Sequence, residues 1–161
     1  MGNDIAALIS SLEKFPSAAF DAAEAGNCFA YERFTAAVYH LMRTTEYGLV
    51  GVAAKIGVPP EKRTRWDKLI QGIQSRIKAI ASNSPPGWRE EEKKYADLCA
   101  WFTAIQKGWR NPVSHVPRFY SEGTAHSMFL ATRTLFEHLH KQGFSEEAMP
   151  ASIEVDDDVV L

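Results

Sequence analysis

Apolar residues recur every three or four positions along most of this chain, and breaks of proline and glycine divide the pattern into separate runs. That spacing places the apolar side chains on one face of an α-helix. The longest run extends from Asn27 to Gly57, and Pro59 and Pro60 end it because proline cannot continue a helix. Its predicted core face comprises Phe34, Val38, Leu41, Thr45, Leu49, Val52 and Ile56.

Three later runs have the same helical period. Ser121 is placed to cap the last of them, and Gly143 is a natural stop. No alternating pattern longer than a few residues indicates a strand. The predicted core faces of these runs are Trp66, Leu69, Ile70, Ile73, Ile77 and Ile80; Tyr95, Leu98, Cys99, Phe102, Ile105 and Trp109; and Ala125, Met128, Phe129, Thr132, Phe136 and Leu139.

Two shorter runs precede these four. Asp4 is expected to cap the first, and Ser17 the second, which stops at Gly26. We therefore predict an all-α fold, an antiparallel helical bundle of about four main helices plus one or two short N-terminal helices. The predicted domain is single and covers 1–161, with 1–26 as an N-terminal helical extension and 145–161 as an acidic, mobile tail.

The composition is typical of a soluble globular protein, with 45% hydrophobic and 24% charged residues and a net charge of −2. Any nucleic-acid site must therefore be a local patch. The N-terminus lacks the pattern of a secretory signal, and no apolar run approaches the ~20 residues of a membrane span. We expect a cytoplasmic protein without a membrane partner.

Nothing in the sequence predicts a metal or a cofactor. Cys28 and Cys99 are isolated from each other in apolar runs and are expected to be buried, reduced thiols. His138 and His140 are two positions apart and point about 200° apart on a helix, so they cannot share a metal ion. We expect both to lie at a solvated helix end.

The stretch "WRNPVSH" contains the chemistry-bearing residues Arg110, Asn111 and His115. On an unbroken helix Arg110 and His115 would lie about 140° apart. Pro112 removes an N–H and disfavours helical angles at Asn111, so the helix should kink or end there and let His115 swing back toward Arg110. The plainer alternative is an ordinary helix exit, with Arg110 bound to the carbonyls of its own helix end.

These residue types suit RNA transesterification without a metal. Arginine can hold two phosphate oxygens and stabilise charge on the phosphorane. Histidine can transfer a proton to or from the ribose 2′-hydroxyl. Asn111 can orient either partner.

The R-N-x-x-x-H spelling at the end of a late bundle helix resembles the HEPN superfamily. The resemblance covers roughly Phe29 to Leu139 and includes the central "AVYHLMRTTEYGLVGVAAKIGV", Trp109 before the motif and a capped final helix. In that family an R-x-x-x-x-H motif marks metal-independent endoribonucleases, many of them toxins or phage-defence effectors, which act as dimers with two motifs in one cleft. The resemblance implies that Arg110, Asn111 and His115 are catalytic.

One position departs from the family pattern. The subfamily paired with nucleotidyltransferase antitoxins has a tyrosine two residues after the histidine, where this chain has Pro117. Regulation by modifying such a tyrosine is therefore not expected, although an antitoxin or other regulatory protein remains a candidate partner.

A second polar group lies on the long central run, where His40, Arg43 and Tyr47 share one helical face and Glu46 is adjacent. Two interpretations remain open: an exposed, salt-bridged face, or a wall of the catalytic cleft in which Glu46 holds Arg110 or orients His115.

The sequence thus favours an RNA-cleaving homodimer. The first alternative is a non-catalytic HEPN-like module that binds a nucleotide or a protein. The second is a structural helical dimer whose motif is only a helix stop.

Overall fold

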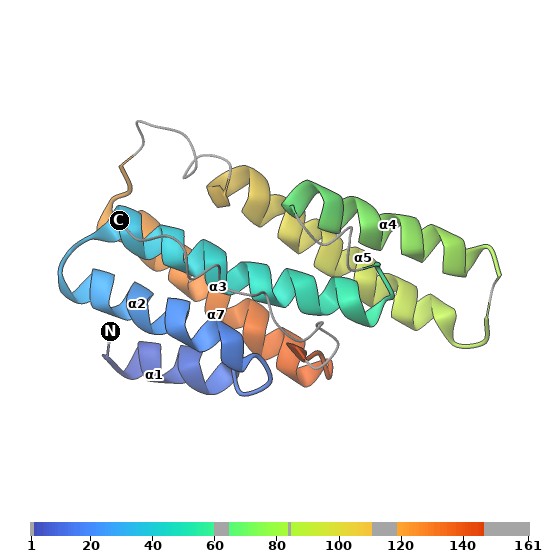
Figure 1. Cartoon of the computed structure of the whole chain (residues 1–161), viewed down its shortest axis with the longest axis horizontal. Coiled ribbons are helices and arrows are strands. Elements are labelled where there is room, and N and C mark those ends of the chain that lie inside the picture. Colours follow the sequence, from blue (N-terminus) through green and yellow to red (C-terminus); the bar gives the residue numbers. More distant parts are fainter. Residues whose placement is uncertain (1, 60–64, 84, 111–118, 147–161) are drawn as a thin grey trace, which may run out of the picture.

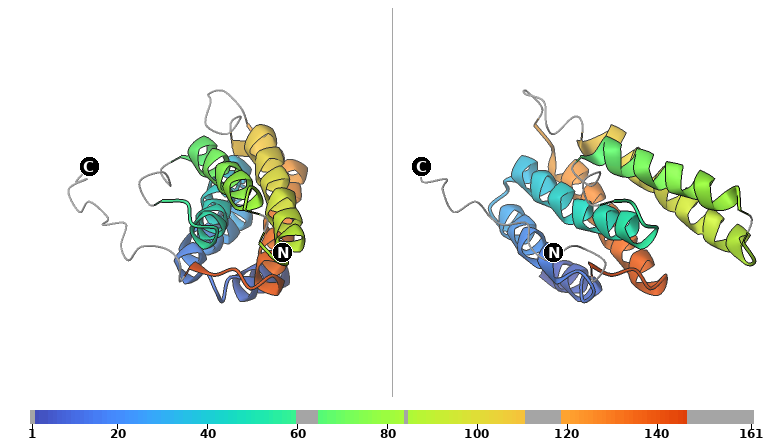
Figure 2. Two further views of the ribbon diagram at one scale, coloured as in Figure 1. Left: turned by 90° about the vertical axis from the view of Figure 1, so that its right-hand side faces the viewer. Right: turned by 45° about the vertical axis from the view of Figure 1, so that its right-hand side comes forward.

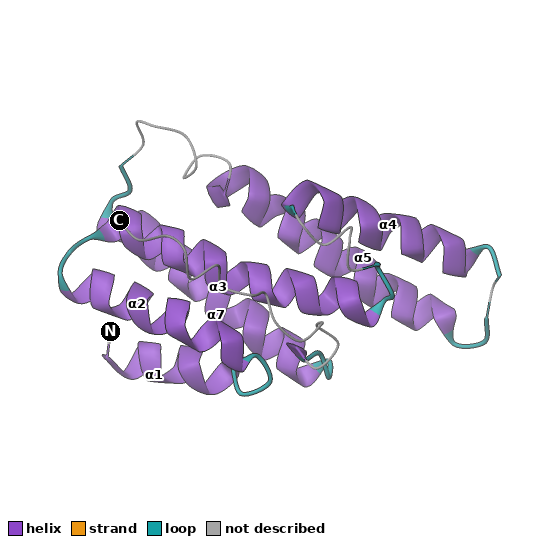
Figure 3. Cartoon of the chain, viewed as in Figure 1, coloured by secondary structure: helices purple, strands orange, loops and turns teal. Residues whose placement is uncertain are grey.

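The computed structural model describes residues 2–59, 65–83, 85–110 and 119–146. In these ranges the chain is helical and contains no strand (Figure 3). The elements, in chain order, are α1 (Gly2–Ser11), η1 (Pro16–Ala18), α2 (Ala19–Ala30), α3 (Phe34–Lys55), α4 (Trp66–Ala81), α5 (Trp88–Ile105), η3 (Gln106–Arg110) and α7 (Glu122–Lys141). The predicted all-α bundle is confirmed, with α3, α4, α5 and α7 as its four main helices.

Helix α3 lies at the centre of the bundle and packs against α2, α4 and α7 (Figure 1). Helices α4 and α5 form a hairpin on one side, whereas α1 and α2 cover the other side, where α1 also contacts α7 (Figure 2). The buried faces are those that the helical period predicts, since Val38, Leu41, Leu49 and Val52 of α3 are fully buried. The N-terminal helices join the same core, because Leu8 and Leu12 of α1 are also buried in it.

The predicted ends of the last helix are confirmed. The Ser121 hydroxyl accepts a hydrogen bond from the Thr124 N–H at 3.3 Å, which satisfies a first-turn donor of α7. Gly143 has a φ of 72°, the left-handed conformation that ends a helix at low cost with glycine.

The predictions for the N-terminal helices need correction. Helix α1 already begins at Gly2, so Asp4 lies inside its first turn and pairs with Arg133 of α7 at 3.4 Å. Ser17 does not cap α2; it lies in the 3₁₀ turn η1 and its hydroxyl hydrogen-bonds to Glu146 at 3.1 Å.

The predicted helix stop at Gly26 is also wrong. Helix α2 continues through Gly26 to Ala30, and the turn that separates it from α3 covers residues 31–33. A Cβ at position 26 would lie 3.1 Å from Ile5 Cγ2, so the glycine allows close packing of α1 on α2. The run from Asn27 to Gly57 is therefore two helices. Glu32 occupies the left-handed region (φ 55°) where the chain reverses.

Candidate functional site

The helix that carries the predicted motif changes its hydrogen-bonding pattern just before the motif. The regular part of α5 ends at Ile105, and residues Gln106–Arg110 form a π-helical turn, η3. Pro112 has no N–H to donate to the Gly108 carbonyl, so a regular helix could not continue through it. π-Helical turns occur frequently at functional sites. Arg110 lies at the last position of η3, whereas Asn111 and His115 lie outside the described residues.

The two chain segments that flank this motif lie at the same end of the bundle. The Tyr120 hydroxyl donates to the Trp109 carbonyl at 3.4 Å, and the Tyr120 N–H donates to Thr35 Oγ1 at 3.0 Å. Trp109 is half-buried against the core, and η3 packs on α3. The end of η3 and the segment that leads into α7 are thereby held against the first turn of α3.

A shallow pocket of about 430 Å³ lies beside this junction. Arg33 supplies a cationic group, its guanidinium carbon 5.8 Å from the centre of the Tyr31 ring. The N-terminus of α3 has no side-chain cap, so no capping side chain satisfies its first-turn N–H groups. Phe34, Thr35 and Ala36, the residues of this first turn, line the pocket. Its lining residues are Glu32, Arg33, Phe34, Thr35, Ala36, Phe119 and Tyr120.

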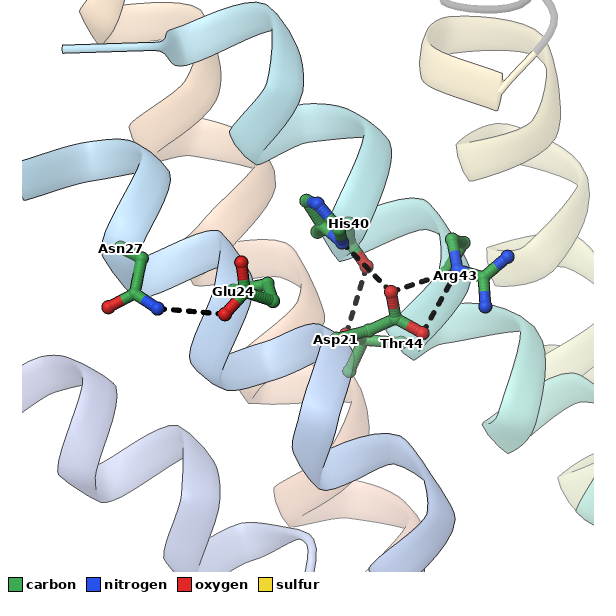
Figure 4. Close-up of polar contacts among 6 residues, drawn as sticks. All are labelled: Asp21, Glu24, Asn27, His40, Arg43 and Thr44. Carbon is green, nitrogen blue, oxygen red and sulfur yellow. Dashed lines mark hydrogen bonds and ion pairs between the residues drawn. The ribbon is translucent and has the colours of Figure 1, made fainter. Parts of the chain in front are cut away.

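The second predicted group is organised by a residue that the sequence analysis did not select. Asp21, in the first turn of α2, is 1% exposed. His40 Nδ1 lies 2.9 Å from its Oδ1, and Arg43 Nε donates to Oδ1 at 2.8 Å and to Oδ2 at 3.0 Å. Figure 4 shows His40 and Arg43 on either side of the carboxylate. We call Asp21, His40 and Arg43 the Asp21 cluster.

Helical geometry explains why the Asp21 cluster forms. His40 and Arg43 are one turn apart on α3, so they share a face. Helix α3 runs back along α2 after the turn at residues 31–33, which brings this face to Asp21. The Thr44 hydroxyl donates to the His40 carbonyl at 3.0 Å.

Asp21 could have been found from the sequence. It has the helical spacing of Ala18, Ala22 and Ala25, all of which are buried. A carboxylate on the apolar face of an alanine-rich helix must be paired. The capping and stop residues Ser17 and Gly26 alone do not reveal this signal.

The cluster influences its neighbours electrostatically. The hydrogen bond that Arg43 donates to Asp21 is the main cause that raises the pKa of Arg43. Burial raises the pKa of Tyr47, with a further contribution from the charge of Asp21. Glu46 is half-buried. The predicted contacts of Glu46 involve the side chain of Arg110 and the residue His115, neither of which the structure describes.

In the described part of the chain, no group of three His, Cys, Asp or Glu side chains is arranged to hold a metal ion. Burial raises the pKa of the Cys99 thiol to about 11, as expected for a buried thiol, whereas Cys28 is only half-buried. His138 and His140 are half-buried rather than solvated, and His138 packs 5.8 Å from the Trp101 ring.

A scan against models of protein families finds no match to this chain. Searches of curated proteins and of solved structures also find no similar chain. Within the described ranges, none of the helices combines the length and the apolar character that a membrane span needs.

Proposed function

We propose that this chain is a cytoplasmic, metal-independent endoribonuclease of HEPN type that acts as a homodimer. The observation that carries the proposal is that Arg110, the first residue of the Arg-Asn-Pro sequence, ends a π-helical turn late in an all-α bundle. The resemblance further suggests a toxin or a phage-defence effector, with an antitoxin or another protein as regulator.

In the proposed reaction, His115 accepts the proton of a ribose 2′-hydroxyl, which attacks the adjacent phosphorus. Arg110 stabilises the negative charge that develops on the phosphorane oxygens, and Asn111 orients one of these groups. The P–O5′ bond then breaks, and the leaving oxygen takes a proton. This chemistry uses the hydroxyl group of the substrate itself as the nucleophile, so it requires no metal-bound water.

The alternative is a non-catalytic module that binds a nucleotide or a protein. The pocket of about 430 Å³ beside Arg33 and Tyr120 favours it, because the pocket combines a cationic group with aromatic side chains at the same end of the bundle. The two proposals differ in whether bound RNA is cut.

The test is incubation of the purified chain with a panel of RNAs in the presence of EDTA. We expect cleavage that leaves a 2′,3′-cyclic phosphate, and we expect a 2′-deoxy residue at the cut site to block it. His115→Ala should lower the rate by about 10²–10⁴, and Arg110→Ala should have a comparable effect.

Arg89→Ala is the matched control, because Arg89 is an exposed arginine in the first turn of α5. It should cleave like the parent chain. A folded parent chain that cuts none of the RNAs, or equal cleavage by the parent and both motif variants, would contradict the nuclease proposal.

A further inference from the structure

The burial of Asp21 is not explained by stability alone. Transferring a carboxylate from water to a protein interior costs several kcal/mol, and buried ion pairs are often no more stabilising than apolar residues of the same size. Asp21 nevertheless lies on the apolar face of α2 with its side chain 2% exposed, while the side chains of its partners His40 and Arg43 are 23% and 50% exposed. The carboxylate is covered, and the groups that it holds reach the surface.

Asp21 fixes the orientation of both partners. A carboxylate offers only acceptors, so His40 donates Nδ1–H to Asp21 and its other ring nitrogen, Nε2, lies on the opposite side of the ring. Arg43 uses Nε for the same carboxylate, which leaves the guanidinium fork at the other end of the side chain. In Figure 4 the fork of Arg43 and the His40 ring extend in different directions from Asp21. This arrangement suits an extended ligand better than a single small anion.

Tyr39 adds an exposed aromatic ring beside these two groups. It is 51% exposed, and its ring centre lies 6.0 Å from that of His40 in an edge-on arrangement. Aromatic rings beside cationic donors are the common recognition elements for single-stranded nucleic acids, because bases stack on the ring while the cations contact phosphates.

We propose that Tyr39, His40 and Arg43 form a second RNA-contacting surface on α3 that binds the sugar-phosphate backbone and one base of single-stranded RNA. This inference rests on the proposed function in taking RNA as the ligand. Asp21 is a positioning residue in it. His40 is five residues beyond Thr35, about 7–8 Å along the helix axis, and Thr35 holds Tyr120 beside the motif-bearing end of η3. A strand bound to this surface can therefore extend toward Arg110.

The acidic neighbour on α2 lies away from Arg43. Glu24 accepts a hydrogen bond from Asn27 Nδ2 at 2.8 Å, and Figure 4 shows that pair on the far side of His40 from Arg43.

The test is a binding titration with the full-length chain carrying His115→Ala, so that cleavage cannot consume the probe. A fluorescently labelled single-stranded oligouridylate is the probe, and its anisotropy is measured at several salt concentrations. Tyr39→Ala should weaken binding about tenfold, as the loss of one stacked base does. Arg43→Gln should weaken it comparably and should reduce the slope of log affinity against log salt by about 0.7, the contribution of one phosphate contact.

Arg65→Gln is the matched control. Arg65 Nε donates to Asp67 Oδ1 at 3.0 Å, so it makes the same kind of pair with an aspartate, but on the surface of another helix. Its affinity and salt slope should equal those of the parent. Circular dichroism establishes that each variant is folded. Tyr39→Ala removes a half-exposed ring that is not part of the buried core, so this variant should fold.

The outcomes separate this inference from the proposed function. Unchanged binding by both Tyr39→Ala and Arg43→Gln, or an equal loss in Arg65→Gln, overturns the second surface even if the parent chain cuts RNA. A parent chain that does not cut RNA, but binds it in a manner dependent on Arg43 and Tyr39, refutes the nuclease and supports the surface. A chain that binds no RNA at all refutes both.

Discussion

Among the described residues, Asp21 is the most deeply buried charged side chain. Its two oxygens accept from one histidine and one arginine of the neighbouring helix, so the carboxylate is paired at both ends. Removing a partner of such a carboxylate and removing the carboxylate itself should therefore differ in their cost to stability. Losing an exposed partner leaves a charge without compensation inside the protein, whereas losing the carboxylate leaves an arginine and a histidine side chain that water can solvate.

This asymmetry predicts a rescue. The double variant His40→Leu with Arg43→Met keeps side-chain bulk over Asp21 but removes both of its partners. It should destabilise the fold by about 3–5 kcal/mol, because an unpaired carboxylate remains buried. Adding Asp21→Ala should recover much of that loss. Urea unfolding at neutral pH, monitored by circular dichroism, measures both changes.

The control for this prediction is Asp21→Ala alone, which should cost less than the double variant. A triple variant that is less stable than the double variant would mean that Asp21 stabilises the fold through contacts other than its charge pairs.

At the scale of the elements, the packing of α3 depends on close approach of its neighbours to the helix backbone as much as on the apolar area that it buries. Gly51 lies where α3 passes Phe15, and a Cβ at this position would lie 2.7 Å from Phe15 Cε1 and 3.0 Å from the Ser145 carbonyl oxygen. The ring belongs to the buried core and the oxygen to the backbone, so neither can easily move away.

Gly51→Ala should therefore lower the free energy of unfolding by about 1–3 kcal/mol, the usual cost of overpacking. The matched change is Gly123→Ala in the first turn of α7, where a Cβ would meet nothing within 4 Å. It should be neutral or stabilise by up to about 1 kcal/mol, because alanine has the higher helix propensity. Thermal unfolding of the two variants beside the parent chain gives the comparison, and equal melting temperatures would show that α3 can shift at Gly51.

The elements were predictable to different degrees, for physical reasons. The four main helices follow from apolar periodicity, because each buries a single continuous face, and Ser121 marks the start of α7 by a local hydrogen bond. The end of α2 was not predictable in this way. Gly26 has the chemistry of a helix stop, yet packing against Ile5 keeps it inside the helix, and that contact depends on tertiary structure.

For the candidate site, the sequence predicted the group on α3 but not its centre. His40 and Arg43 were predicted from their spacing on one helix. Asp21 lies on another helix and is recognisable only from its position on the buried face of that helix. Arg110, Asn111 and His115 remain a sequence-based prediction. The structure adds to it the π-helical turn that ends at Arg110.

At the scale of the whole molecule, one chain contributes one Arg110 and one His115 to the proposed reaction, which needs both a base and an acid. A twofold axis would double this set, because an isologous interface brings the same patch of both chains together. The two Arg110 side chains would repel each other in such a cleft unless an anion lies between them, which favours a phosphate there.

This arrangement predicts complementation between two inactive chains. Arg110→Ala and His115→Ala homodimers should each be nearly inactive, but a mixture that has exchanged subunits contains heterodimers with one intact Arg110 and one intact His115 in the shared cleft. Cleavage by the mixture should therefore exceed that of either homodimer. Light scattering at micromolar concentration measures the assembly state. Mixtures of each motif variant with Arg89→Ala control for the dilution of one kind of subunit by another. A parent chain that is monomeric and fully active, or a mixture of exchanged subunits with no gain in cleavage, would exclude a cleft shared between two chains.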